Sequence, residues 1–119
     1  MFETVLLPMD ANPQALDTAV KALELVQGHD SCLVLLELLD LAPDPSLLER
    51  IKARIDPSGV TCQRLERGGE PLTVILDVAD ELNVDVIVMG TGGVSLNSDD
   101  GSTAARVIEL APCPVLVVP

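Results

Sequence analysis

The residues best suited to chemistry lie in a glycine-bearing stretch in the last third of the sequence. Gly90 and Gly93 follow an apolar run, and Gly101-Ser102 opens a helical pattern. Glycine lets a backbone approach a ligand closely, and the free N–H groups at a helix start favour an anion. The spacing therefore indicates a loop that binds phosphate through backbone amides, with Thr103 as a further amide donor.

Two carboxylates in the same stretch oppose this chemistry. Asp99 and Asp100 lie inside it, no Lys or Arg lies between Gly69 and Thr103, and Arg106 is a turn into the following helix. A carboxylate about 4 Å from a phosphate charge costs about 1 kcal/mol in water and about 4 kcal/mol at an intermediate dielectric. A helix N-terminus contributes only about 0.3–1 kcal/mol. Three explanations stay open: the carboxylates cap the helix, face solvent, or hold a divalent cation such as Mg²⁺ that bridges to the phosphates.

Apolar runs alternate with helical patterns along the chain. Short apolar runs predict strands at residues 4–9, 32–39, 59–65, 85–89 and 114–118. Helical spacing predicts four helices: from Asn12-Pro13 to Gly28, over 43–55, from Glu70-Pro71 onward, and after Ser102. This alternation is typical of one α/β domain, residues 1–119, built around a parallel sheet. The third strand is the most polar and is expected at a sheet edge.

The ends of two strands mark where a ligand is expected. In open parallel sheets, ligands bind beyond the carboxyl ends of the strands, where the strand order reverses. Asp10 follows the first predicted strand, and Gly90 follows the fourth. These two residues are therefore candidate ligand contacts.

Composition excludes several classes of function. The chain has 19 acidic and 7 basic residues, and its net charge of −12 repels nucleic acid and anionic membranes. MFETVLLPMD lacks a basic leader, and Glu37 and Asp40 interrupt the longest apolar segment, so we expect a cytoplasmic protein without a membrane span. His29 is the only histidine, so neither a catalytic triad nor a zinc hydrolase site is supported.

The three cysteines indicate neither a metal site nor a disulfide framework. Cys32, Cys62 and Cys113 are widely spaced and form no Cys-x-x-Cys pair. Free cysteine is among the most buried residue types. We therefore expect reduced and mostly buried thiols.

Three segments together resemble the universal stress protein family. They are VLLPMDANPQALDTAVKALELV, GGEPLTVILDVADELNVDVIVMGTGG and GSTAARVIELAPCPVLVVP, which cover nearly the whole chain. The resemblance implies a five-stranded parallel sheet of order 3-2-1-4-5 with helices on both faces. That fold is Rossmann-like and related to the adenine nucleotide alpha hydrolases.

The family's nucleotide motif is present in a shortened and acidic form. Gly-x2-Gly-x9-Gly-(Ser/Thr) is matched by Gly90, Gly93 and Gly101-Ser102, but seven residues instead of nine separate the second and third glycines. Val94 stands where the family usually has a basic residue. The resemblance thus implies an inherited phosphate site that has lost part of its affinity.

The resemblance also implies which residues surround an adenine nucleotide. Asp10 would contact the nucleoside, Val34 or its neighbours would border the adenine, and the amides of the glycine loop would face the phosphates. The nucleotide would be ATP or another adenine nucleotide, with Mg²⁺ as a possible companion. The expected nucleotide-binding residues are Pro8, Asp10, Val34, Met89, Gly90, Gly93, Gly101, Ser102 and Thr103.

These features predict a cytoplasmic stress-response protein. It would act by binding an adenine nucleotide, or by contacts between protein chains that need no nucleotide, with at most very slow ATP hydrolysis. The alternative is an adenylyl-transfer enzyme of a related α/β fold, which needs a basic or histidine-rich phosphate site that this sequence does not show. A phospho-acceptor receiver domain would need an Asp ending the third strand and a Lys ending the fifth, which Leu65-Glu66-Arg67 and Val117-Val118-Pro119 do not supply.

The last predicted strand is expected to join two copies of the chain. It is apolar on both faces, and the resemblance places it at a sheet edge, where an exposed strand invites pairing. In this family such pairing commonly produces a homodimer. The predicted contact residues are Val115, Leu116, Val117 and Val118.

Overall fold

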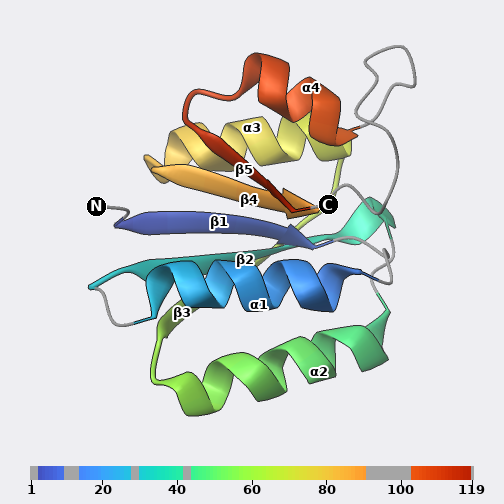
Figure 1. Ribbon diagram of the computed structural model, residues 1–119. Helices are drawn as coiled ribbons and strands as arrows, with labels where there is room; N and C mark the ends of the chain where they lie inside the picture. Colours follow the sequence, from blue (N-terminus) through green and yellow to red (C-terminus); the bar gives the residue numbers. More distant parts are fainter. Residues whose placement is uncertain (1–2, 10–13, 28–29, 42–43, 91–102, 119) are drawn as a thin grey trace.

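The chain folds into a central sheet with helices on both faces (Figure 1). The structure, a computed structural model, describes residues 3–9, 14–27, 30–41, 44–90 and 103–118. Among the described helices, none combines the length and the hydropathy needed to cross a bilayer.

Five parallel strands form the sheet in the order β3-β2-β1-β4-β5. This order confirms the one that the family resemblance implied. The central strands are mostly apolar because helices cover both faces of a parallel sheet. The strands are β1 (Thr4–Met9), β2 (Cys32–Leu38), β3 (Thr61–Arg67), β4 (Val86–Gly90) and β5 (Val115–Val118).

Four α-helices connect the strands in two layers. The helices α1 and α2 cover one face of the sheet, and α3 and α4 cover the other (Figure 1). Short 3-10 turns follow β2 and α2 at Leu39–Leu41 and Asp56–Ser58. The α-helices are α1 (Ala15–Val26), α2 (Pro45–Ile55), α3 (Pro71–Glu81) and α4 (Thr103–Leu110).

Two aliphatic cores hold these layers together. Side chains of β1 alternate between them: Val5 and Leu7 pack toward α1 and α2, whereas Leu6 packs toward α3 and α4. All three are at most 1% exposed. Burial of the central strands on both faces fixes the sheet register, because a shift by one residue would send each side chain to the opposite core.

Most elements begin or end one or two residues from the expected positions, and the starts of α1 and β3 are two examples. The helix α1 begins at Ala15 after Gln14, whose side chain makes no capping bond, whereas Asn12-Pro13, the expected start, lies outside the described residues. The strand β3 begins two residues late because Gly59, at a φ of 75°, first ends the preceding 3-10 turn in a left-handed conformation. The edge position expected for this polar strand is confirmed.

The cysteines are free, as expected, but the expectation that they are mostly buried is wrong. Cys32, Cys62 and Cys113 are all partly exposed. Their positions explain this: Cys32 begins a strand, Cys62 lies on the edge strand β3, and Cys113 lies in the turn before β5. Desolvation is therefore incomplete, although burial still raises the pKa of the Cys62 and Cys113 thiols above the usual value.

Candidate functional site

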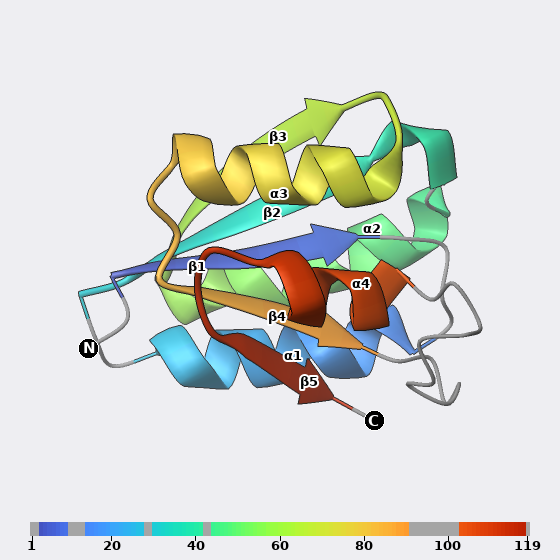
Figure 2. The same cartoon turned by 90° about the horizontal axis from the view of Figure 1, so that it is seen from above.

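The strand order reverses between β1 and β4. The strand β1 pairs with β2 on one side and with β4 on the other, so the chain leaves the sheet centre in opposite directions from these two strands. Their carboxyl ends are Met9 and Gly90. The views in Figures 1 and 2 show the carboxyl ends of the strands and the N-terminal ends of α1, α3 and α4 at the same edge of the sheet. This edge is the place where an α/β sheet of this order binds a ligand.

Gly90 lies in close contact with α1 at this edge. A Cβ atom built on Gly90 would lie 2.5 Å from Oγ1 of Thr18 and 3.7 Å from the backbone oxygen of Val118. Thr18 is 5% exposed, and its hydroxyl donates to the backbone oxygen of Gln14 at 3.4 Å. The end of β4 therefore has room for glycine alone as long as Thr18 keeps its place.

Three further predicted residues lie at or near the same edge. Pro8 is partly buried near the end of β1, opposite Leu36 of β2. Met89 precedes Gly90 and is 8% exposed in the core beneath α4. Thr103 is the first residue of α4 and is partly exposed. Pro8, Met89, Gly90 and Thr103 therefore all lie toward the edge of the sheet at which β1 and β4 end.

Val34 does not lie with this group. It is the third residue of β2, pairs with Leu6 and Gln63, and is 1% exposed in the core beneath α3 and α4. Leu38 ends the strand four residues later. The remaining predicted residues, Asp10, Gly93, Gly101 and Ser102, lie outside the described residues, as do Asp99, Asp100 and His29.

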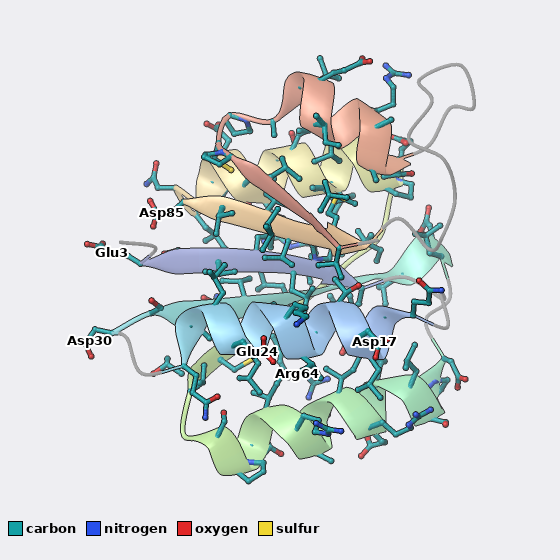
Figure 3. The ribbon with its side chains drawn as sticks, viewed as in Figure 1. Glu3, Asp17, Glu24, Asp30, Arg64 and Asp85 are labelled. Atoms are coloured by element: carbon teal, nitrogen blue, oxygen red, sulfur yellow. The ribbon has the colours of Figure 1, made fainter. Side chains whose placement is uncertain are left out.

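Sequence reasoning missed a buried carboxylate near the end of β2. Glu37 is 4% exposed, opposite Met9 of β1, and its Oε1 accepts a hydrogen bond of 2.8 Å from Nη2 of Arg64 on β3. This bond raises the pKa of the Arg64 guanidinium. Figure 3 shows Arg64 on the side of the sheet that α1 and α2 cover. The signal was available, because Glu37 is the one charge in an otherwise apolar strand.

The N-terminus of α3 is occupied by its own carboxylate. Glu70 accepts hydrogen bonds from the backbone N–H groups of Leu72 at 3.2 Å and Thr73 at 2.9 Å, and from the Thr73 hydroxyl at 2.9 Å. These bonds lower the pKa of Glu70, and Arg106 of α4 adds a smaller effect in the same direction. The amides at the start of α3 are therefore already satisfied by the chain itself.

A second surface feature lies beside β5, on the side of β4 that faces away from β1. Leu116 of β5 is 42% exposed, although it is a large apolar residue. It borders a groove of about 440 Å³ between α1 and β5, where an ion pair of 3.5 Å joins Lys21 to Glu24. The groove is lined by Lys21, Glu24, Leu25, Leu116, Val117 and Val118.

Comparison with known proteins identifies the family. The sequence profile of the universal stress protein family matches residues 44–119, which is more than half of the chain. The chain belongs to the universal stress protein family. A universal stress protein of Synechocystis is 39% identical over 100% of this chain and 87% of its own length.

Solved structures of universal stress proteins share the fold. One, a universal stress protein in complex with cAMP, has a TM-score of 0.81 at 20% identity, over 99% of this chain and 97% of that chain. Another, from Arabidopsis thaliana with AMP bound, has a TM-score of 0.71 at 20% identity, over 98% of this chain and 90% of that chain. The strand order seen here is therefore the universal stress protein architecture.

The described part of the universal stress protein fold contains no evident metal centre. Within the described ranges, no group of three or more His, Cys, Asp and Glu side chains is arranged to hold a metal ion.

Proposed function

We propose that this chain is a cytoplasmic stress-response protein that binds an adenine nucleotide at the edge between β1 and β4 and pairs as a homodimer through β5. The observation that carries the nucleotide proposal is the reversal of strand order at Met9 and Gly90, in a chain of the universal stress protein family. Two structural neighbours of the same fold hold cAMP and AMP, which supports an adenine nucleotide as the ligand.

The proposed contacts divide into a nucleoside part and a phosphate part. Pro8, Met89 and Gly90 lie at the edge where the nucleoside would lie, and Asp10 follows β1 directly. Glycine-loop residues and the start of α4 would donate backbone N–H groups to phosphate. The phosphate contacts proposed are Gly93, Gly101, Ser102 and Thr103.

The charge of the chain favours nucleotides with few phosphate charges. No Lys or Arg lies between residues 68 and 105, and Asp99 and Asp100 lie within the proposed phosphate loop. A carboxylate near a phosphate costs about 1 kcal/mol or more for each close pair of charges. cAMP carries a single negative charge, and each added phosphate brings another unfavourable pair. We therefore expect cAMP and AMP to bind more tightly than ATP, with Mg²⁺ reducing the difference.

Binding without turnover fits these residues best. Hydrolysis requires groups that orient a water molecule and neutralise charge on the transferred phosphoryl group. Arg106 is the nearest basic residue to the loop in the sequence. It lies exposed on α4, where its charge helps to lower the pKa of Glu70. We therefore propose that a bound nucleotide acts as a signal and is turned over at most very slowly.

The homodimer proposal depends on the β5 edge. An apolar edge strand is a template for pairing unless charges, proline or a covering element block it. The strand β5 carries no charge, and Leu116 is exposed beside the groove. The opposite edge strand, β3, carries Arg64, Glu66 and Arg67 and is protected by these charges.

Calorimetric titration tests the nucleotide proposal. Purified protein is titrated with cAMP, AMP, ADP and ATP, each with and without Mg²⁺, beside the variant Asp99→Gly/Asp100→Gly. We expect affinity to fall from cAMP to ATP and the variant to narrow that difference. If neither the wild type nor the variant binds any of the four nucleotides, the nucleotide proposal is overturned and the dimer proposal still stands.

A further inference from the structure

A residue of α1, Thr18, limits which side chains fit at the end of β4, and sequence reasoning did not find it. Gly90 is the last residue of β4, and the chain continues from it into residues 91–102. A Cβ atom at this position would lie 2.5 Å from Oγ1 of Thr18, a separation that real Cβ atoms essentially never show. With its side chain in this rotamer, Thr18 excludes every side chain at position 90 unless α1 or β4 moves.

Thr18 itself has little freedom to move away. It is 5% exposed, and α1 packs against the sheet around it through Ala15, Ala19 and Ala22, none of which exceeds 8% exposure. Its hydroxyl donates to the backbone oxygen of Gln14, four residues earlier, at 3.4 Å. A β-branched side chain in a helix has few χ1 alternatives, and this back-bond occupies one of them. The hydroxyl is thus held against the end of β4.

The other side of Gly90 is closed by the sheet. Gly90 pairs with Val118 of β5, whose backbone oxygen would lie 3.7 Å from a Cβ atom at position 90. A substituted residue 90 therefore has ordinary contact with β5 and a clash with α1. While Thr18 keeps this rotamer, relief of that clash requires a shift of β4 relative to α1, and the carboxyl end of β4 at Gly90 would move with it.

We propose that Thr18 is a positioning residue of the nucleotide site: by leaving room for glycine alone at position 90, it fixes the carboxyl end of β4, one of the two strand ends at which the proposed nucleotide site lies. The proposal rests on the proposed function and deepens it. In this chain the glycine at position 90 is required by the packing of α1, while the nucleotide itself would tolerate a methyl group there.

A double-mutant cycle separates these two requirements. The variants are Gly90→Ala, Thr18→Ala and the pair together, each measured by urea unfolding and by calorimetric titration with AMP and cAMP. Overpacking at a rigid site is destabilising, so Gly90→Ala alone is expected to lower the unfolding midpoint and to weaken nucleotide binding about tenfold. Thr18→Ala removes Oγ1, and the double variant is expected to regain both the midpoint and the affinity of Thr18→Ala alone.

Thr18→Val supplies the matched control. Valine keeps the branched shape of threonine and places a methyl group where the hydroxyl can lie, but it cannot bond to Gln14. Gly90→Ala combined with Thr18→Val is therefore expected to remain weak in both measurements. Rescue by Thr18→Val equal to that by Thr18→Ala would show that the steric explanation is wrong.

The outcomes distinguish this inference from the proposed function. If the wild type binds AMP or cAMP and the folded double variant does not, the ligand itself requires glycine and the inference is overturned, while the nucleotide function stands. If the wild type binds no nucleotide, the proposed function and the positioning role both fail, and only the coupling in stability remains. If Gly90→Ala does not fold, refolding of the double variant becomes the test, and its failure to fold also overturns the inference.

Discussion

The carboxylate of Glu37 lies buried against the half-exposed guanidinium of Arg64, with 2.8 Å between Oε1 and Nη2. Glu37 reaches this partner across the β2–β3 pair from a position next to the buried end of β1. A buried carboxylate without a partner is costly, whereas removal of both charges is often neutral. Replacement of one partner alone is therefore expected to cost stability, whereas the intact pair adds little to the total free energy of unfolding.

We expect Arg64→Met to destabilise the protein by about 2 kcal/mol, since it strands Glu37 in the core while water still reaches part of the site. Glu37→Met combined with Arg64→Met is expected to recover most of that loss. Urea unfolding of the two single variants and the double variant measures the coupling. Additive losses in the double variant would show that the two side chains do not depend on one another.

Asp85 ties the start of β1 to the start of β4. Its Oδ2 accepts hydrogen bonds of 2.9 Å from the backbone N–H groups of Glu3 and Thr4, and Figure 3 shows Asp85 beside Glu3. Asp85→Ala leaves both donors to solvent, so a loss of about 1–2 kcal/mol is expected. Hydrogen exchange at Thr4 should become faster. Asp77→Ala, an exposed residue of α3 with the same charge change, is the control and should leave that exchange unchanged.

The architecture was predictable because its signals are local. The runs that form β1, β2 and β4 are mostly apolar, and Glu70-Pro71 marks the start of α3 as the structure has it. The polar third strand indicated its own edge position. The order of the strands came from the family resemblance, because pairing between distant segments leaves no periodic trace in one sequence.

The site was predictable only in part, because the spacing of residues along the sequence does not reveal contacts between distant elements. Gly90 was found as a glycine after a strand, but the reason for a glycine there is the approach of Thr18, which depends on how closely α1 packs on β4. Val34 was expected beside the adenine, and its place in the middle of β2 emerges from strand register. Register was beyond the reach of the sequence pattern alone.

The cap of α3 makes the stability of the fold depend on acid. The pKa of Glu70 is lowered, first by the backbone and hydroxyl groups of Thr73, so its ionised form is favoured in the folded state. The stabilisation is fully present above the unfolded pKa, about 4.5, and is lost as pH falls through the lower folded value. We expect Glu70→Gln to flatten the fall of the urea midpoint below that pH. Glu109→Gln, which removes an exposed carboxylate in the last turn of α4, should keep the wild-type slope.

The proposed dimer edge makes the last prediction, which compares two exposed leucines. Leu116 on β5 is 42% exposed and Leu39 after β2 is 48% exposed, so both substitutions to Glu remove similar apolar surface. If β5 pairs with its copy, Leu116→Glu buries two like charges near the pairing axis and should weaken dimerisation by at least about tenfold. Leu39→Glu should leave it unchanged. Sedimentation velocity over a range of protein concentrations measures both. Equal effects of the two variants would place the dimer contact elsewhere than β5, and a wild type that remains monomeric throughout would overturn the dimer proposal.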